Sequence, residues 1–235
     1  MLATMADADR YAREWGRFAG RPAPPTPRFD QDWFPGLDAA LLYGVVRVRR
    51  PARIVEVGSG HSTRFAARAV LDAALQTEFI AIDPQPRAAI EALAPTVDFR
   101  RATIQDIDLV LFDRLRSGDI LFIDSSHILM PGSDVDILFN RVLPRLAAGV
   151  LVHIHDVFLP DPYPPEWEWR GYNEQNVAAA LIEGGGYRLI AASRFIETRM
   201  RAAYARDFAA LPPSPPGAMA SSLWLEKRVA PPGGE

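Results

Sequence analysis

The sequence contains no cysteine among its 235 residues. This absence excludes disulfides, thiolate nucleophiles and thiolate metal ligands together. Any metal would have to be held by carboxylates or by the four histidines. Long apolar runs are also missing, because neither the N-terminal segment nor any later stretch approaches the ~18 apolar residues that a membrane-spanning helix needs. We therefore expect a cytoplasmic protein without a membrane partner.

A large excess of positive charge is missing as well, since the formal net charge is -3. A phosphate-rich polymer would find little non-specific attraction, and nucleic acid is not expected as a partner. Hydrophobic residues make up 49% and charged residues 23%, which is ordinary globular composition. The length suits one domain. The sequence leaves open whether the protein forms a homo-oligomer.

From residue 52 onward, short apolar runs alternate with helix-length segments, a pattern typical of a parallel α/β sheet covered on both faces. Seven strands are expected, at residues 53–57, 78–82, 98–102, 120–123, 150–154, 188–192 and 222–226. Helices are expected between them at residues 62–75, 86–93, 106–115, 135–146 and 174–183. The last connection is rich in arginine and proline, shows no helix, and favours an antiparallel strand at the sheet edge.

The N-terminal segment has a different pattern. Tyr11, Trp15 and Phe18 have helical spacing before a proline-rich linker, and a second helix is expected just before Pro51. Residues 1–50 are thus predicted to form a helical extension and linker, 51–228 the main domain, and 229–235 a disordered tail.

The most informative stretch is Ile54–Thr63, where a predicted strand ends in a glycine-rich turn that leads into a helix. Such a turn lets the backbone approach a nucleotide-like ligand closely. A dinucleotide fingerprint would need a third glycine at Thr63, and Glu56 would repel a phosphate but attract an ammonium or sulfonium group. The predicted cofactor-binding residues of this turn are Glu56, Gly58, Ser59, Gly60 and Ser62.

The ends of the next two strands add polar groups to the same sheet edge. Asp83 ends the second strand and is well placed to accept hydrogen bonds from ribose hydroxyls. Gln105 and Asp106 follow the third strand, and either one could contact an adenine amino group.

Acidic and histidine residues follow the fourth and fifth strands. Asp124 and His127 come after the fourth, and His155 and Asp156 after the fifth, so we expect all four to converge. His127 is the first candidate and His155 the second for a general base that takes a hydroxyl proton. His153 is expected to point to the opposite face from His155. Asp156 is a further catalytic candidate, and Asp124 and Asp156 would orient a histidine or hold a divalent cation.

Four motifs in order, EVGSGHSTRFA, AIDP, DILFIDSSH and GVLVHIHDV, resemble those of class I S-adenosylmethionine-dependent methyltransferases, and within them methyltransferase family 24. The resemblance covers about residues 50–190. It implies a Rossmann-like sheet of seven strands, mostly parallel with the last antiparallel, helices on both faces, and S-adenosylmethionine bound by residues 51–228. It places Glu56, Gly58 and Gly60 at the methionine end, Asp83 at the ribose and Gln105 or Asp106 at the adenine, with Asp124 also in the cofactor site.

The resemblance also bears on a metal. In catechol-type relatives, an aspartate after the fourth strand and an Asp-Asn or Asp-Asp pair after the fifth hold magnesium, with a base three residues beyond the first aspartate. Asp124 and His127 have that spacing, but Asp156 is followed by Val157, so one ligand is missing. Asp124 and Asp156 remain the candidate magnesium ligands.

The predicted function is therefore methylation of a small-molecule hydroxyl with a histidine base. The aromatic residues of the segment after the fifth strand are expected to cover the acceptor pocket: Tyr163, Trp167, Trp169 and Tyr172. Three alternatives stay open: a nicotinamide-dependent oxidoreductase, a non-catalytic protein that binds S-adenosylmethionine, and an aminopropyl transferase.

Overall fold

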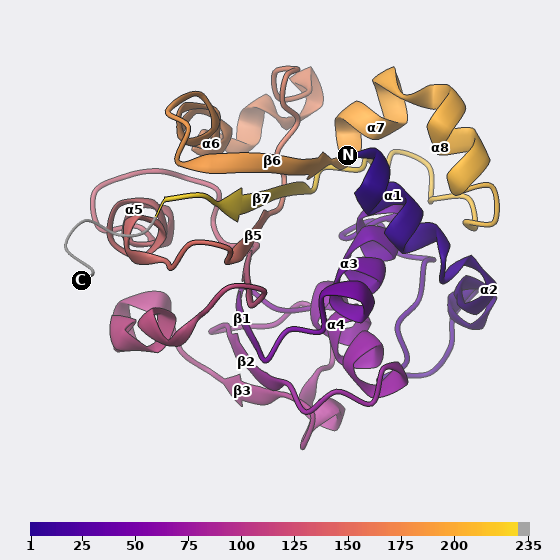
Figure 1. The fold of residues 1–235 in the computed structure, drawn as a ribbon, viewed down its shortest axis with the longest axis horizontal. Coiled ribbons are helices and arrows are strands. Elements are labelled where there is room, and N and C mark those ends of the chain that lie inside the picture. Colours follow the sequence, from indigo (N-terminus) through magenta and orange to yellow (C-terminus); the bar gives the residue numbers. More distant parts are fainter. Residues whose placement is uncertain (230–235) are drawn as a thin grey trace.

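The computed structural model describes residues 1–229, which form a seven-stranded sheet with helices on both faces (Figure 1). The strands are β1 Arg53–Val57, β2 Glu78–Ile82, β3 Asp98–Arg100, β4 Ile120–Ile123, β5 Leu151–Ile154, β6 Tyr187–Ala192 and β7 Leu223–Lys227. The α-helices are α1 Leu2–Asp9, α2 Ala12–Trp15, α3 Gly36–Arg49, α4 His61–Asp72, α5 Asp134–Ile137, α6 Glu174–Glu183, α7 Ser193–Arg199 and α8 Arg201–Asp207. A π-helical turn, Leu138–Val142, continues α5.

The strand order is β3-β2-β1-β4-β5-β7-β6, with β7 antiparallel to both of its neighbours. The seven strands and the antiparallel last strand are confirmed. The predicted edge position of β7 is wrong, because β7 lies between β5 and β6 and β6 forms the edge. Leu223, Trp224 and Leu225 are all at most 1% exposed, and a strand that is apolar on both faces favours an interior position.

Side chains alternate along the strands and build one hydrophobic core on each face. Ile54 of β1 and Trp224 of β7 belong to the core beneath α1, α3 and α4. Val55 and Leu225, their neighbours in sequence, belong to the core beneath α5 and α6. Figure 1 shows these two groups of helices on opposite sides of the sheet.

The predicted absence of a helix between the last two strands is wrong, because α7 and α8 lie there. Ile196, Met200, Tyr204 and Phe208 recur every fourth residue and pack against the core of α1 and α3. The arginines between them occupy the outer face and hide this helical periodicity in the sequence.

The predicted helix at residues 86–93 is also wrong, since only the 3₁₀ turn Glu91–Leu93 is formed. The backbone oxygen of Ala89 instead accepts hydrogen bonds from Nη2 and Nε of Arg64, at 2.7 and 3.0 Å. The predicted helix at residues 106–115 is a 3₁₀ helix, Leu109–Arg114, because the Asp108 carboxylate caps its start by accepting from the Val110 amide at 3.0 Å.

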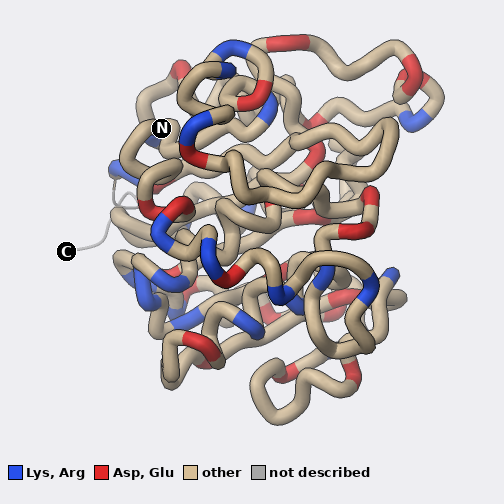
Figure 2. Tube along the Cα trace, turned by 90° about the vertical axis from the view of Figure 1, so that its right-hand side faces the viewer, with Lys and Arg blue, Asp and Glu red and all other residues tan. Residues whose placement is uncertain are grey.

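The N-terminal segment is helical, as predicted, and packs onto the main core. α1 lies so close to α3 that a Cβ atom at Gly44 would stand 2.5 Å from Cα of Ala8. No helix within residues 1–229 is long and apolar enough to cross a bilayer. Figure 2 shows acidic and basic residues interspersed along the chain, in line with the small net charge. The predicted tail at 229–235 lies outside the described residues except for residue 229.

Candidate active site

The turn after β1 is built around Gly58. Its φ is +84°, and a Cβ atom there would stand 1.8 Å from the backbone oxygen of Asp124. Val57 pairs with Ile123 across β1 and β4, so Gly58 and Asp124 follow two neighbouring strand ends. Only a glycine fits this close approach in this conformation.

Asp83 holds the same turn from the end of β2. Its carboxylate accepts hydrogen bonds from the backbone amides of Ser59 and Gln85, both at 2.6 Å. These bonds fix the turn beside the second strand and leave further lone pairs on the carboxylate free for a ligand.

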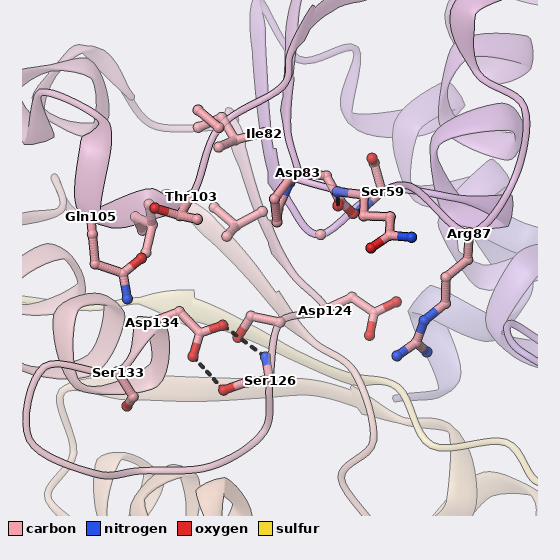
Figure 3. A pocket seen from close by; sticks show the side chains of 17 residues that line it. Ser59, Ile82, Asp83, Arg87, Thr103, Gln105, Asp124, Ser126, Ser133 and Asp134 are labelled. Carbon is pink, nitrogen blue, oxygen red and sulfur yellow. Dashed lines mark hydrogen bonds between the residues drawn. The ribbon is translucent and has the colours of Figure 1, made fainter.

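A cavity of about 490 Å³ opens at this edge of the sheet (Figure 3). Gln105 lies toward one end of it and Arg87 toward the other. The predicted cofactor residues that line it are Gly58, Ser59, Asp83, Gln105 and Asp124. Lining residues that the sequence reasoning missed include Gln85, Arg87, Thr103, Ser126, Ser133 and Asp134.

Four predicted cofactor residues do not line the cavity. The Glu56 carboxylate accepts a hydrogen bond from the Ser62 hydroxyl at 2.6 Å beneath the turn. The Gly60 amide donates to Oγ1 of Thr63 at 2.9 Å, at the start of α4. Asp106 accepts from Oγ1 of Thr103 at 2.7 Å instead of facing the cavity.

Glu56 is a buried acid in which only one of the two carboxylate oxygens has a hydrogen-bond partner among the described residues. It is 1% exposed, and its Oε2 atom has no hydrogen-bond partner within residues 1–229. Burial, together with the nearby carboxylates of Asp124 and Asp83, raises the pKa of Glu56 to about 8 against the effect of the Ser62 hydrogen bond. The side chain therefore favours its protonated form at neutral pH.

The structure brings Asp124, His127 and Asp156 together, as the sequence predicted. Nε2 of His127 lies 3.3 Å from Oδ1 of Asp124 and 3.4 Å from Oδ2 of Asp156. On the other side of the ring, Nδ1 makes a short hydrogen bond with the carboxylate of Glu174, the first residue of α6. His127 is 2% exposed, so three carboxylates surround a buried imidazole.

These surroundings fix the charge of His127. Burial opposes a positive charge on the imidazole, but Glu174, Asp124 and Asp156 outweigh it and raise the pKa of His127 well above 6.5. Burial likewise opposes ionisation of Asp124, but the positive charges of His155 and His127 hold the pKa of Asp124 well below its usual range. At neutral pH the cluster therefore contains an imidazolium ion between carboxylates.

The backbone at this cluster adopts a strained conformation. His127 has a φ of +62° and Asp156 a φ of +54°, in the left-handed region that residues with a side chain rarely occupy. Such strain gathers at functional sites, where the surrounding structure over-determines the conformation. The two residues follow β4 and β5, so the strained turns direct both side chains to the same point.

His155 joins the cluster from β5. Its Nε2 donates to the backbone oxygen of Trp33 at 3.0 Å and lies 3.6 Å from Oδ1 of Asp156. The expectation that His153 points to the opposite face is wrong, because residues two apart in a strand share a face. The two rings stack at 5.9 Å, and His153 also stacks on Phe122 at 3.8 Å. Burial holds the pKa of His153 well below 6.5.

A second cavity, of about 190 Å³, adjoins this cluster and reaches His155 and Asp156. Of the predicted aromatic cover, Trp167 lines it. Tyr172 instead packs its ring 4.5 Å from that of His127, and Trp169 is 81% exposed. The remaining lining residues are Asp32, Trp33, Arg170, Pro216, Gly217, Met219 and Ser221.

The donor set does not fit the magnesium ion of catechol-type relatives. Asp124 and Asp156 both face Nε2 of His127, so the imidazolium occupies the place between them that a cation would take. Val157, at the missing ligand position, is buried and apolar. Residues 1–229 contain no group of three or more histidine, aspartate or glutamate side chains arranged to hold a metal.

Two buried residues of the cluster's surroundings were missed by the sequence reasoning. Glu174 has the sequence pattern of an ordinary acid in the first turn of a helix. Asp38, in α3, accepts hydrogen bonds from the backbone amides of Ser221 and Ser222 at 2.9 and 3.1 Å. Ser221 in turn donates to Oδ1 of Asp156 at 3.1 Å. Asp38 likewise lies in the first turn of its helix, so neither acid differs in sequence pattern from an ordinary helix-start residue.

The sheet order, the inserted antiparallel strand and the turn after β1 define a class I methyltransferase fold. Residues 55–157 match methyltransferase family 24, described as a methyltransferase domain, which confirms the resemblance seen in the motifs. Among curated proteins, none matches the chain.

Solved structures of two methyltransferases share this fold. The SAH-bound methyltransferase PaMTH1 of Podospora anserina is 17% identical, with a TM-score of 0.52 over 96% of this chain and 88% of that one. The O-methyltransferase from Bacillus cereus, in complex with SAH, is 12% identical, with a TM-score of 0.52 over 96% of this chain and 91% of that one. At these identities the likeness is one of fold.

Proposed function

We propose that the protein transfers a methyl group from S-adenosylmethionine, held in the first cavity, to a hydroxyl of a small molecule held in the second. The observation that carries this proposal is the position of His127. Its Nε2 lies between Asp124, which lines the first cavity, and Asp156, which lines the second. SAH, the demethylated form of the cofactor, is bound in both similar structures, and one of them is an O-methyltransferase.

The residues present suit this cofactor. Gly58 lets the turn pass close to the backbone of Asp124 at the cavity, and Ser59 Oγ and Glu56 Oε2 are buried without hydrogen-bond partners within residues 1–229. Carboxylates at Asp83 and Asp124 favour a cationic ligand over a pyrophosphate. Asp83 would accept hydrogen bonds from the ribose hydroxyls, and Gln105 would contact the adenine. The cofactor supplies an electrophilic methyl group on a sulfonium centre.

The acceptor must lose its hydroxyl proton as the new carbon–oxygen bond forms. Asp156 lines the second cavity, so its carboxylate meets the hydroxyl directly and accepts the proton. His127 bears a proton of its own in the resting protein, so it holds Asp156 and Asp124 in place by charge and hydrogen bonding. A base role for His127 itself would first require loss of that proton, and the pH dependence of the rate distinguishes the two roles.

Holding both reactants at the two ends of the Asp124–His127–Asp156 cluster would remove much of the entropic cost of bringing them together. Glu174 is essential to this arrangement, because its bond to Nδ1 orients Nε2 toward both aspartates. The strained backbone of His127 and Asp156 serves the same alignment.

Isothermal titration with S-adenosylmethionine and SAH tests the proposal, with NAD and NADP as controls. We expect micromolar binding of the first two, lost in Gly58→Arg and retained in Gly60→Ala, whose added Cβ meets no atom within 4 Å. Binding of NAD or NADP alone would favour an oxidoreductase. Binding of S-adenosylmethionine without methyl transfer to any hydroxyl acceptor would favour the non-catalytic alternative.

A further inference from the structure

Arg170 stands at the second cavity inside an aromatic wall. It ends the 3₁₀ turn Pro165–Arg170 and lines the cavity beside Trp167. The centre of its guanidinium group lies 4.0 Å from the ring centroid of Trp167 and 5.4 Å from those of Trp169 and Tyr172. These rings fix the orientation of the cation.

Arg170 has no acidic partner within residues 1–229. Its one hydrogen bond runs from Nη1 to the Tyr172 hydroxyl at 3.3 Å, and its Nε atom is buried without a partner. A buried donor on a charged group is costly when it stays unpaired. The guanidinium group is a type that forms paired hydrogen bonds with carboxylates, and at Arg170 it lines the cavity without a carboxylate partner within residues 1–229.

No other charged group among the described residues that line the cavity is placed to bind a carboxylate in place of Arg170. Asp156 interacts with His127, His155 and Ser221, so its negative charge is already compensated. Asp32 is the one further acid among the lining residues. Apolar side chains reach the cavity from Trp33, Trp167, Pro216 and Met219.

The size of the cavity limits the acceptor. A volume of about 190 Å³ is many times the ~10–15 Å³ that a single water needs by the same measure, so a substituted six-membered ring can enter. Aromatic and apolar walls suit the faces of a planar ring.

We propose that the acceptor is a small aromatic hydroxy acid, with its hydroxyl at Asp156 and its carboxylate bound by Arg170. This inference rests on the proposed function, because it takes the second cavity as the acceptor site. Arg170 then determines specificity, and it plays no part in the chemical step.

Calorimetry in the presence of saturating SAH tests the inference with probes of three matched classes: 3- and 4-hydroxybenzoate, the corresponding hydroxybenzamides, and 4-hydroxybenzylamine. In the native protein we expect at least one hydroxybenzoate to bind about tenfold more tightly than its amide, as a charge-assisted pair provides. Arg170→Gln should abolish this preference and Arg170→Lys should keep part of it. The matched control is Arg13→Gln, at an exposed arginine of α2 that lines neither cavity.

SAH affinity provides the second readout and should be unchanged in all three variants. Equal binding of acid and amide, tighter binding of the amine under the influence of Asp32, or no binding of any hydroxybenzoate to the SAH-bound protein would each overturn the inference while the proposed function stands. Failure of the native protein to bind SAH would overturn the proposed function, and this inference with it.

Discussion

Replacing Glu174 with glutamine removes one of the three carboxylates around His127 while keeping nearly the same side-chain shape. The raised pKa of His127 means that its bound proton stabilises the fold. That contribution is fully present at a pH below the ordinary histidine pKa of about 6.5. It is lost as the pH rises through the raised pKa of His127 in the folded protein. Glu174→Gln should therefore lower the free energy of unfolding most at low pH.

The structure sets the size of the effect. Breaking a buried ion pair by removing one partner typically costs about 3–5 kcal/mol. Asp124 and Asp156 remain at 3.3 and 3.4 Å, so we expect the lower end, about 3 kcal/mol at pH 6. Loss of the Glu174 carboxylate should also lower the pKa of His127.

Denaturant unfolding at pH 6 and pH 9, together with an NMR titration of the His127 ring, measures both quantities. Glu183→Gln is the matched control, because it makes the same change at an exposed position of the same helix. The reasoning fails if Glu174→Gln is no less stable than this control at pH 6, or if the pKa of His127 stays where it was.

Three further predictions follow from the turn after β1 and from the cluster. Gly58→Ala should lower the free energy of unfolding by about 2–4 kcal/mol and abolish SAH binding, because its Cβ would be overpacked at a positive φ. Gly60→Ala should match the native protein in thermal unfolding and in calorimetry. Equal behaviour of the two variants would contradict the turn geometry. Because the pKa of Glu56 is about 8 in the folded protein, the free energy of unfolding should fall as the pH rises from about 5 to 8. Denaturant titrations of Glu56→Gln should show a smaller fall. An unchanged dependence of stability on pH would contradict a buried, protonated acid. Asp156→Asn should lower kcat by about 10²–10⁴-fold. The kcat of the native protein should fall as the pH rises through the raised pKa of His127. A kcat that rises over this range would instead assign the base role to His127.

The residues at the strand ends could be predicted because local rules determine them. A strand that ends in Gly58 and leads into a helix fixes a turn, and parallel strands bring Asp124 and Asp156 to one edge. Glu174 could not be predicted in this way, because it lies 47 residues beyond His127 and reaches it only through the docking of α6.

The remaining errors have similar causes. The position of β7 depends on pairing with both β5 and β6, which no local pattern specifies. Gln105 and Asp106 share one 3₁₀ turn, Ile104–Asp106, where a single residue of register decides which side chain faces the cavity. The charge of Glu56 favoured a place beside a cationic ligand, but the sequence carries no sign that Ser62 would hold its carboxylate beneath the turn.

Charge links the two cavities through Asp124, which lines the first and contacts Nε2 of His127. A sulfonium ion near Asp124 would compete with His127 for the same carboxylate and would favour ionisation of Glu56. In the proposed reaction, methyl transfer would remove the sulfonium charge, so the carboxylates would attract the product less than the substrate. The same event would return Asp124 to His127 as its main counter-charge. The acidic surroundings would thus favour the charged cofactor, and the buried imidazole would compensate the carboxylates once that charge is gone.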